Sequence, residues 1–183
     1  MSRSTAATRG REQDAAALPP RFAAWFERRG WTPRGHQIEA LDAALAGEDA
    51  LLIAPTGAGK TLAGFLPSLV ELEAAPAGGR LHTLYVSPLK ALAVDVERNL
   101  ATPIAEIGLA ATAETRTGDT PASKRRRQMG RPPDILLTTP EQVALMLASP
   151  DAPFLFGALR RVVIDELHAF AGTKRGDLLA LGL

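Results

Sequence analysis

A chain of 183 residues, 46% of them hydrophobic, can bury one sizeable core, so we expect one globular unit with a tail rather than two full domains. The formal net charge of +1 excludes attraction to nucleic acid through bulk charge, and any basic surface must be local. The absence of cysteine excludes disulfides and thiolate metal sites, and three scattered histidines do not suggest a structural zinc site.

The sequence shows no signal for membrane insertion or export. No apolar run approaches the roughly 20 residues of a membrane-spanning helix, and the first 17 residues lack the apolar stretch of a signal peptide. We therefore expect a soluble cytoplasmic protein with no membrane partner.

The N-terminal part is expected to contain a tail followed by two helices. Residues 1–18 are small and polar with no hydrophobic period, which predicts a disordered tail and a domain over 19–183. Phe22, Trp25 and Phe26 then fall on one helical face, and Gly30 closes the run. A second helix is predicted from Gln37 to about residue 46.

Short apolar runs then alternate with amphipathic segments. The predicted strands cover 50–54, 83–87, 112–115, 134–138 and 161–165, and the predicted helices cover 60–72, 89–100, 121–129 and 141–148. Strands that are apolar on both faces and alternate with helices predict an α/β fold, with a parallel sheet covered by helices on both faces. Ligands of such sheets bind at the carboxyl ends of the strands.

The first predicted strand runs directly into a candidate phosphate-binding loop, Ala-Pro-Thr-Gly-Ala-Gly-Lys-Thr at 54–61, which precedes a helix. Glycines let backbone N–H groups curl around phosphates, while Lys60 would reach the β and γ phosphates and Thr61 would ligate Mg²⁺. Ala54 stands where the general pattern has its first Gly, and the alternative is an ordinary turn of small residues. We predict ATP or GTP binding through Pro55, Thr56, Gly57, Ala58, Gly59, Lys60 and Thr61.

An acidic pair follows the apolar run at 162–164. In phosphate-loop NTPases an Asp at this strand end holds Mg²⁺ and an adjoining Glu orients or deprotonates the attacking water. We therefore predict that Asp165 and Glu166 act with Lys60 as catalytic residues; the alternative for the pair alone is a solvated strand end.

Leu167 and His168 complete the sequence Asp-Glu-Leu-His, and here the chain resembles superfamily 2 DExH-box helicases. The likeness covers 20–183 and includes further blocks at 35–37, 87–92, 117–119 and 138–141, in the same order. It implies a RecA-like P-loop NTPase domain in which Gln37 reads adenine. It also implies that His168 couples the ATP state to a second RecA-like domain, although a lone His is more often structural.

Within this superfamily, Ser-Pro-Leu-Lys-Ala-Leu at 87–92 and Gly-Thr-Lys-Arg-Gly at 172–176 resemble the large helicase-related (Lhr) group. The segments 22–26 and 30–33 resemble its bacterial ligase-associated branch. That resemblance implies ATP-dependent 3′-to-5′ movement on single-stranded DNA in repair, beside a DNA ligase and a nuclease. RNA, in place of DNA, remains the alternative nucleic acid.

A motor that holds the sugar-phosphate backbone needs hydroxyls, Lys and N–H groups at helix starts. The candidates, each at or just past a predicted strand end, are Ser87, Lys90, Thr117, Gly118, Thr139 and Glu141. The segment 139–141 is also a good helix start, with Thr139 as N-cap. For the basic cluster at 124–127 a solvated helix face is favoured over an auxiliary DNA contact. Trp31 is expected either to pack or to stack on adenine.

The sequence ends inside a predicted helix, before any second RecA-like domain. We expect this chain to bind ATP·Mg²⁺ weakly, to hydrolyse it slowly if at all, and not to unwind DNA, because the second domain supplies the arginines that stabilise the transferring phosphate. The leading function is the ATP-binding domain of a DNA helicase or translocase. The alternatives are a nucleotide-dependent clamp or remodelling module, an RNA helicase, and a switch or transporter ATPase unrelated to nucleic acid, against which the strand-gripping blocks argue.

Overall fold

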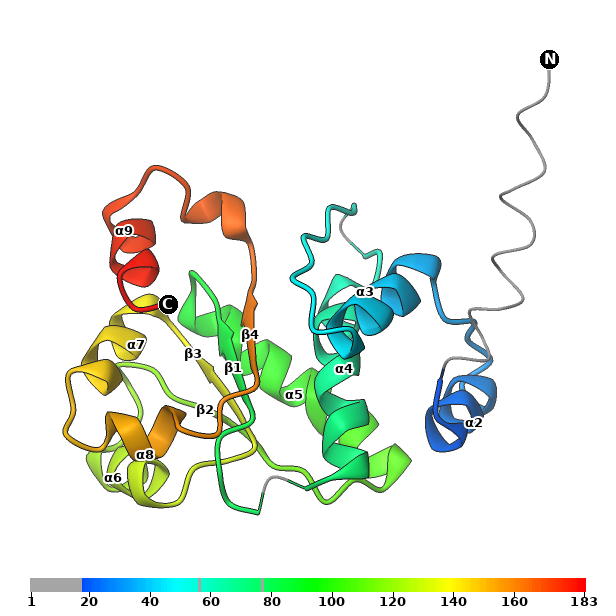
Figure 1. Cartoon of the computed structure of the whole chain (residues 1–183), viewed down its shortest axis with the longest axis horizontal. Helices are drawn as coiled ribbons and strands as arrows, with labels where there is room; N and C mark the ends of the chain where they lie inside the picture. The colour runs from blue at the N-terminus through cyan, green and yellow to red at the C-terminus, as the bar shows by residue number, and fades with distance from the viewer. Residues whose placement is uncertain (1–17, 56, 77) are drawn as a thin grey trace. The chain divides into compact units, whose positions relative to one another are not determined.

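The computed structural model describes residues 18–55, 57–76 and 78–183, and it divides into two compact units, 1–71 and 72–183 (Figure 1). The tail predicted over 1–18 lies outside the described residues except for Leu18, which is buried. Within the described ranges no helix is both long and apolar enough to cross a membrane.

The first unit contains α2 (Pro20–Arg28), α3 (Gly35–Leu45) and all but the last turn of α4 (Lys60–Ala74). Helix α2 begins with Pro20 at its first position, where the missing N–H costs no hydrogen bond, and it buries the predicted face of Phe22, Trp25 and Phe26. Trp25 packs edge-on against Phe26 and Trp31, with ring centroids 5.0 and 5.7 Å apart. The predicted helical face of Phe22, Trp25 and Phe26 is therefore confirmed.

The predicted strand over 50–54 is wrong. These residues form no strand, and the side chains of Leu51 and Ile53 are 71% and 86% exposed. An apolar run becomes a strand only when a neighbouring strand accepts and donates its backbone hydrogen bonds. The described sheet takes all its strands from the second unit, so the hydrophobic pattern at 50–54 was not sufficient.

The second unit is built on a four-stranded parallel sheet with the order β2-β3-β1-β4. Its strands are β1 (Thr83–Val86), β2 (Ala113–Thr115), β3 (Ile135–Thr138) and β4 (Arg161–Ile164). The connecting helices are α5 (Lys90–Ile107), α6 (Ala122–Gly130), α7 (Pro140–Leu147) and α8 (Ala152–Phe156), and β4 is followed by η1 (Leu167–Ala169) and α9 (Lys174–Ala180).

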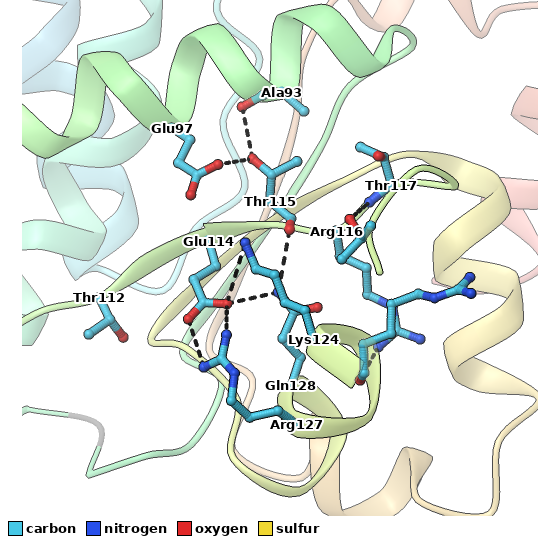
Figure 2. A network of polar contacts seen from close by, with 12 residues as sticks. Ala93, Glu97, Thr112, Glu114, Thr115, Arg116, Thr117, Lys124, Arg127 and Gln128 are labelled. Atoms are coloured by element: carbon cyan, nitrogen blue, oxygen red, sulfur yellow. Dashed lines mark hydrogen bonds and ion pairs between the residues drawn. The ribbon is translucent and has the colours of Figure 1, made fainter. Parts of the chain in front are cut away.

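Strand β2 shows how the two faces of the sheet are covered, because its neighbouring residues point in opposite directions (Figure 2). Thr115 donates to Glu97 and its hydroxyl oxygen lies 3.5 Å from the Ala93 carbonyl oxygen, both in α5, whereas Glu114 accepts from Arg127 of α6. On the α6 face the buried side chains of β1 and β3 pack with α7, α8 and α9 in one cluster: Leu81, Leu84, Val86, Leu136, Val143, Met146, Leu155, Phe170 and Leu179. The predicted parallel sheet with helices on both faces is confirmed.

Helix α5 runs seven residues beyond its predicted end at residue 100 and ends at Ile107. Its buried positions continue at Leu100, Pro103 and Ile107, so burial of this face outweighs the hydrogen bond that Pro103 cannot donate. Gly108, with a left-handed φ of 74°, ends the helix.

Candidate nucleotide and nucleic-acid sites

The candidate phosphate loop lies in the first unit, directly before α4. Gly57 and Gly59 have φ values of 76° and 75°, which glycine adopts without steric cost. Lys60 opens α4, and its Nζ donates to the carbonyl oxygens of Ala54 at 2.8 Å and Pro55 at 3.3 Å. The ammonium group thus lies against the loop, where phosphate oxygens could replace these acceptors. Thr61 follows in the first turn with an exposed side chain, and Thr56 lies outside the described residues.

The start of α3 is fastened to this loop. The buried Gln37 accepts a hydrogen bond from the Arg34 backbone N–H at 2.9 Å and donates through Nε2 to the Gly59 carbonyl oxygen at 3.3 Å. The Arg34 guanidinium donates to the Gly57 carbonyl oxygen at 3.3 Å. Gln37 therefore touches the loop, while its contact with adenine stays a prediction. Arg34 was not among the predicted residues; its position three residues before Gln37 was the available signal.

Substitution of Gly59 by Ala should weaken nucleotide binding by about tenfold or more, because the new Cβ would lie 2.8 Å from Gln37 Nε2 and would occupy a left-handed conformation that costs roughly 1–2 kcal/mol. Binding of a fluorescent ATP analogue measures this. Gly47→Ala is the matched control, since its φ is 77° and no atom lies within 4 Å of its Cβ. Equal affinities for the two variants would contradict a specific role of the Gln37 contact.

The acidic pair stands at the end of β4, in the second unit. The Asp165 backbone N–H donates to the Val86 carbonyl oxygen at 2.9 Å. Its Oδ1 accepts from the Glu166 N–H at 2.9 Å, and its Oδ2 accepts from the Tyr85 hydroxyl. Burial raises the pKa of Tyr85 above its ordinary value, and the hydrogen bond to Asp165 and the charge of Asp165 raise it further. Tyr85 was not among the predicted site residues, because an aromatic residue inside an apolar strand is typical of the hydrophobic core.

Glu166 has a φ of 49° and is the one non-glycine residue in the described part of the chain with a positive φ. A left-handed conformation costs a side chain of this size roughly 1–3 kcal/mol and is often found at functional positions. The Glu166 carboxylate lies 3.3 Å from His168 Nδ1, and His168 is 81% exposed. The chain therefore turns sharply between Asp165 and η1.

This conformation predicts an unusual order of stability. Glu166→Gly should exceed Glu166→Ala in free energy of unfolding by about 1 kcal/mol, because glycine adopts the positive φ without strain. Urea unfolding of both variants measures the difference. At an ordinary helical or extended position the Ala variant is the more stable of the two. An Ala variant as stable as the Gly variant would therefore show that the backbone at Glu166 is unstrained.

The parallel register brings the residues predicted to contact nucleic acid to the C-terminal end of the sheet. Ser87 and Thr139 follow β1 and β3, and the Ser87 backbone N–H donates to the Thr138 carbonyl oxygen at 2.9 Å. Thr117 lies two residues past β2. The side chains of Ser87, Thr117 and Thr139 are buried, so in this structure they pack within this end of the sheet, and their contact with nucleic acid stays a prediction.

Lys90 is the exposed cation at this edge. It opens α5, and its Nζ lies 2.9 Å from Asp119 Oδ2, while a Cβ built on Gly118 would lie 3.6 Å from the same Nζ. The absence of a side chain at Gly118 therefore leaves Lys90 accessible beside the loop that follows β2. An ion pair this exposed is weak enough for a phosphate to replace Asp119.

Glu141, in the first turn of α7, is engaged with the protein. Its carboxylate accepts hydrogen bonds from the Arg175 guanidinium of α9, one of them at 3.2 Å. The hydrogen bond from Arg175 lowers the pKa of Glu141 to about 2, against the smaller effect of burial. Because a carboxylate repels phosphate, this side chain is better suited to fastening α7 to α9 than to attracting a strand.

The depressed pKa of Glu141 sets the pH dependence of stability. A carboxyl group with a lowered folded pKa stabilises the fold above its unfolded pKa of about 4.5, and this contribution is lost as the pH falls toward about 2. Glu141→Gln should therefore lower the melting temperature at pH 7 and show a narrowing difference from the unsubstituted chain below pH 5. Asp95→Asn is the control: its pair with Arg98, at 3.9 Å and widely exposed, should contribute nothing measurable.

The basic cluster at 124–127 is partly neutralised within the fold (Figure 2). Glu114 accepts from Arg127 at 2.6 Å and lies 3.9 Å from Lys124. Burial works against the charged form of Glu114, but hydrogen bonds from Arg127 and Gln128 and the charges of Arg127 and Lys124 hold its pKa below the ordinary value. Two cations of the cluster thus face a structural partner rather than solvent alone.

Each unit offers an oxygen ligand of the kind that suits magnesium. The hydroxyl of Thr61 in the first unit and the carboxylate of Asp165 in the second are both hard oxygen donors, which Mg²⁺ prefers. Among the described residues no three His, Asp or Glu side chains cluster as a metal site. A magnesium ion would therefore depend on oxygen atoms of the nucleotide as well as on the protein, as is usual in phosphate-loop enzymes.

Comparison with known proteins agrees with these features. The DEAD/DEAH box helicase family matches residues 34–183. The Lhr helicase/probable uracil glycosylase of Mycolicibacterium smegmatis is 48% identical over 172 residues, which cover 87% of this chain and 11% of that protein. The ATP-dependent helicase Lhr-Core of Methanothermobacter thermautotrophicus is 37% identical over 179 residues, which cover 91% of this chain and 21% of that protein.

A solved structure, that of the Mycobacterium smegmatis helicase Lhr bound to ssDNA and AMP-PNP, matches with a TM-score of 0.85 and 44% identity over 92% of this chain and 23% of that one. The predicted RecA-like fold and the predicted resemblance to the Lhr group are thereby confirmed. The chain spans 11% and 21% of the two curated relatives named above. The narrower resemblance to the ligase-associated branch stays a prediction.

Proposed function

The chain belongs to the DEAD/DEAH box helicase family, and we propose that it is the ATP-binding domain of a motor that moves along single-stranded DNA. The observation that carries the proposal is the carboxyl edge of the sheet in the second unit. There Asp165, at the end of β4, bonds through its backbone to Val86, the residue before Ser87. A movement of Asp165 or Glu166 when nucleotide binds can therefore be passed through the end of β1 to Ser87, which is predicted to contact nucleic acid.

The proposal assigns a role to each candidate residue around the nucleotide. Lys60 binds the β and γ phosphates, and Gln37 contacts the adenine ring. Thr61 and Asp165 hold the magnesium ion, and Glu166 orients the attacking water. When bound, Mg²⁺ offsets the charge that develops on the transferring phosphate.

The nucleic acid and a second domain are the partners of this chain. Contact with the nucleic acid is made by Ser87, Lys90, Thr117, Gly118 and Thr139, with Glu141 supporting α7. His168, largely exposed beside Glu166, transmits the nucleotide state to a second RecA-like domain. That domain supplies arginines worth roughly 10³ to 10⁵ in rate.

The strand is single-stranded DNA, by analogy with the M. smegmatis Lhr helicase that was solved with ssDNA. Movement in the 3′-to-5′ direction, a place in DNA repair beside a ligase and a nuclease, and a cytoplasmic location complete the proposal.

A hybrid in which this chain replaces the matching segment of the M. smegmatis Lhr helicase would test the function, because the rest of that protein supplies what lies beyond the match. We expect ATP hydrolysis that single-stranded DNA stimulates. Lys60→Ala or Glu166→Gln should lower it on the order of 100-fold, as for loss of a charge-stabilising or proton-accepting group. Asp95→Asn, on the exposed side of α5, should leave it unchanged.

Each other outcome supports a different function. Stimulation by DNA without strand displacement would favour a clamp or remodelling module. Stronger stimulation by single-stranded RNA would favour an RNA helicase. Hydrolysis indifferent to both nucleic acids would contradict the motor and favour a switch ATPase, and full turnover in Lys60→Ala would remove the site assignment.

A further inference from the structure

Tyr85 reaches from the middle of one strand to the acidic end of the next. Tyr85 in β1 is the register partner of Val163 in β4, and Asp165 comes two residues after Val163. Residues two apart on a strand lie on the same face of a sheet, so Tyr85 and Asp165 share a face. The phenol spans this offset and donates to Asp165 Oδ2.

The contact leaves the Asp165 carboxylate with little freedom to rotate. Oδ2 is held by the Tyr85 hydroxyl, Oδ1 by the Glu166 N–H at 2.9 Å, and the Asp165 backbone by Val86. Tyr85 itself is 2% exposed, so its ring is locked by packing and cannot follow a rotating carboxylate. Both oxygens are thus oriented while each keeps a lone pair for a cation.

Ser87 lies two residues after Tyr85, on the same face of the sheet. Its hydroxyl donates to the Leu89 carbonyl oxygen at 3.3 Å, while the Tyr85 hydroxyl donates to Asp165. A phenylalanine would fill the same space in the sheet without burying a polar group, so volume alone does not account for the hydroxyl.

We propose that Tyr85 is a positioning residue that fixes the Asp165 carboxylate for the magnesium ion. The proposal rests on the proposed ATP-binding function. Groups that hydrogen-bond to a metal-binding carboxylate typically change metal affinity by about 10- to 100-fold. The expected effect therefore falls on magnesium rather than on the nucleotide as such.

The contact can be tested without any ligand, because Tyr85 is the single tyrosine of the chain. Labelling with 3-fluorotyrosine gives one ¹⁹F NMR resonance that reports on this hydroxyl. Asp165→Asn should shift that resonance, whereas Glu114→Gln, an acidic residue of the same sheet held by Arg127, should not. A resonance that ignores Asp165→Asn would overturn the proposal.

The positioning role is tested by Tyr85→Phe, which removes one oxygen atom. Binding of a fluorescent ATP analogue to the 183-residue chain is titrated with Mg²⁺ and repeated in EDTA. We expect the Mg²⁺ concentration at half-saturation to rise about tenfold while affinity in EDTA is unchanged. An unchanged Mg²⁺ titration, or an equal loss with and without Mg²⁺, would assign Tyr85 a merely structural role.

Two further outcomes are distinguishable. If the unsubstituted chain binds no nucleotide, the proposed function fails, and the magnesium role of Tyr85 fails with it even where the ¹⁹F signal verifies the contact. If Tyr85→Phe does not fold, the fluorotyrosine-labelled chain replaces it: addition of Mg²⁺ with nucleotide should shift the resonance, and nucleotide in EDTA should not. Equal shifts in both conditions would overturn the proposal.

Discussion

Parallel pairing of β1 with both β3 and β4 is the constraint on which the second unit depends. Parallel strands end at the same edge, so residues far apart in the sequence are delivered to one line: Ser87, Thr139 and Asp165 each follow a strand of this group. The pairing continues one step beyond the strands, through the hydrogen bonds from Ser87 to Thr138 and from Asp165 to Val86. The strand ends are consequently rigid, which suits side chains that must be held in place.

Rigidity of the strand ends contrasts with strain in the turn that follows β4. Glu166 occupies a left-handed conformation although it has a full side chain, and it is followed at once by η1 and then by α9. Two contacts anchor this segment: Phe170 is buried in the core cluster, and Arg175 binds Glu141 of α7. A strained residue persists only where its surroundings over-determine it, and these anchors supply that condition.

In the first unit, side-chain hydrogen bonds rather than strand pairing hold the candidate phosphate loop. Gln37 and Arg34 bind the carbonyl oxygens of Gly59 and Gly57, so the start of α3 restrains the glycines whose freedom a phosphate loop requires. Lys60 closes the same loop from the other side through Ala54. The loop is thus both flexible in composition and restrained in place.

The sequence by itself determined the fold class, four of the five predicted strands, the helices between them except α8, and the order of the motifs, because hydrophobic period and glycine placement are local properties. It failed where a neighbour distant in the sequence decides. Residues 50–54 have the composition of a strand without its pairing, and α5 extends past Pro103 because its buried face continues. Only the tertiary structure identified the contacts of Arg34 and Tyr85: the position of Arg34 near Gln37 hinted at a role, but its bond to Gly57 and the bond of Tyr85 to Asp165 form only in the folded chain. Backbone hydrogen bonds and side-chain contacts across strands depend on register, and register exists only in the folded chain.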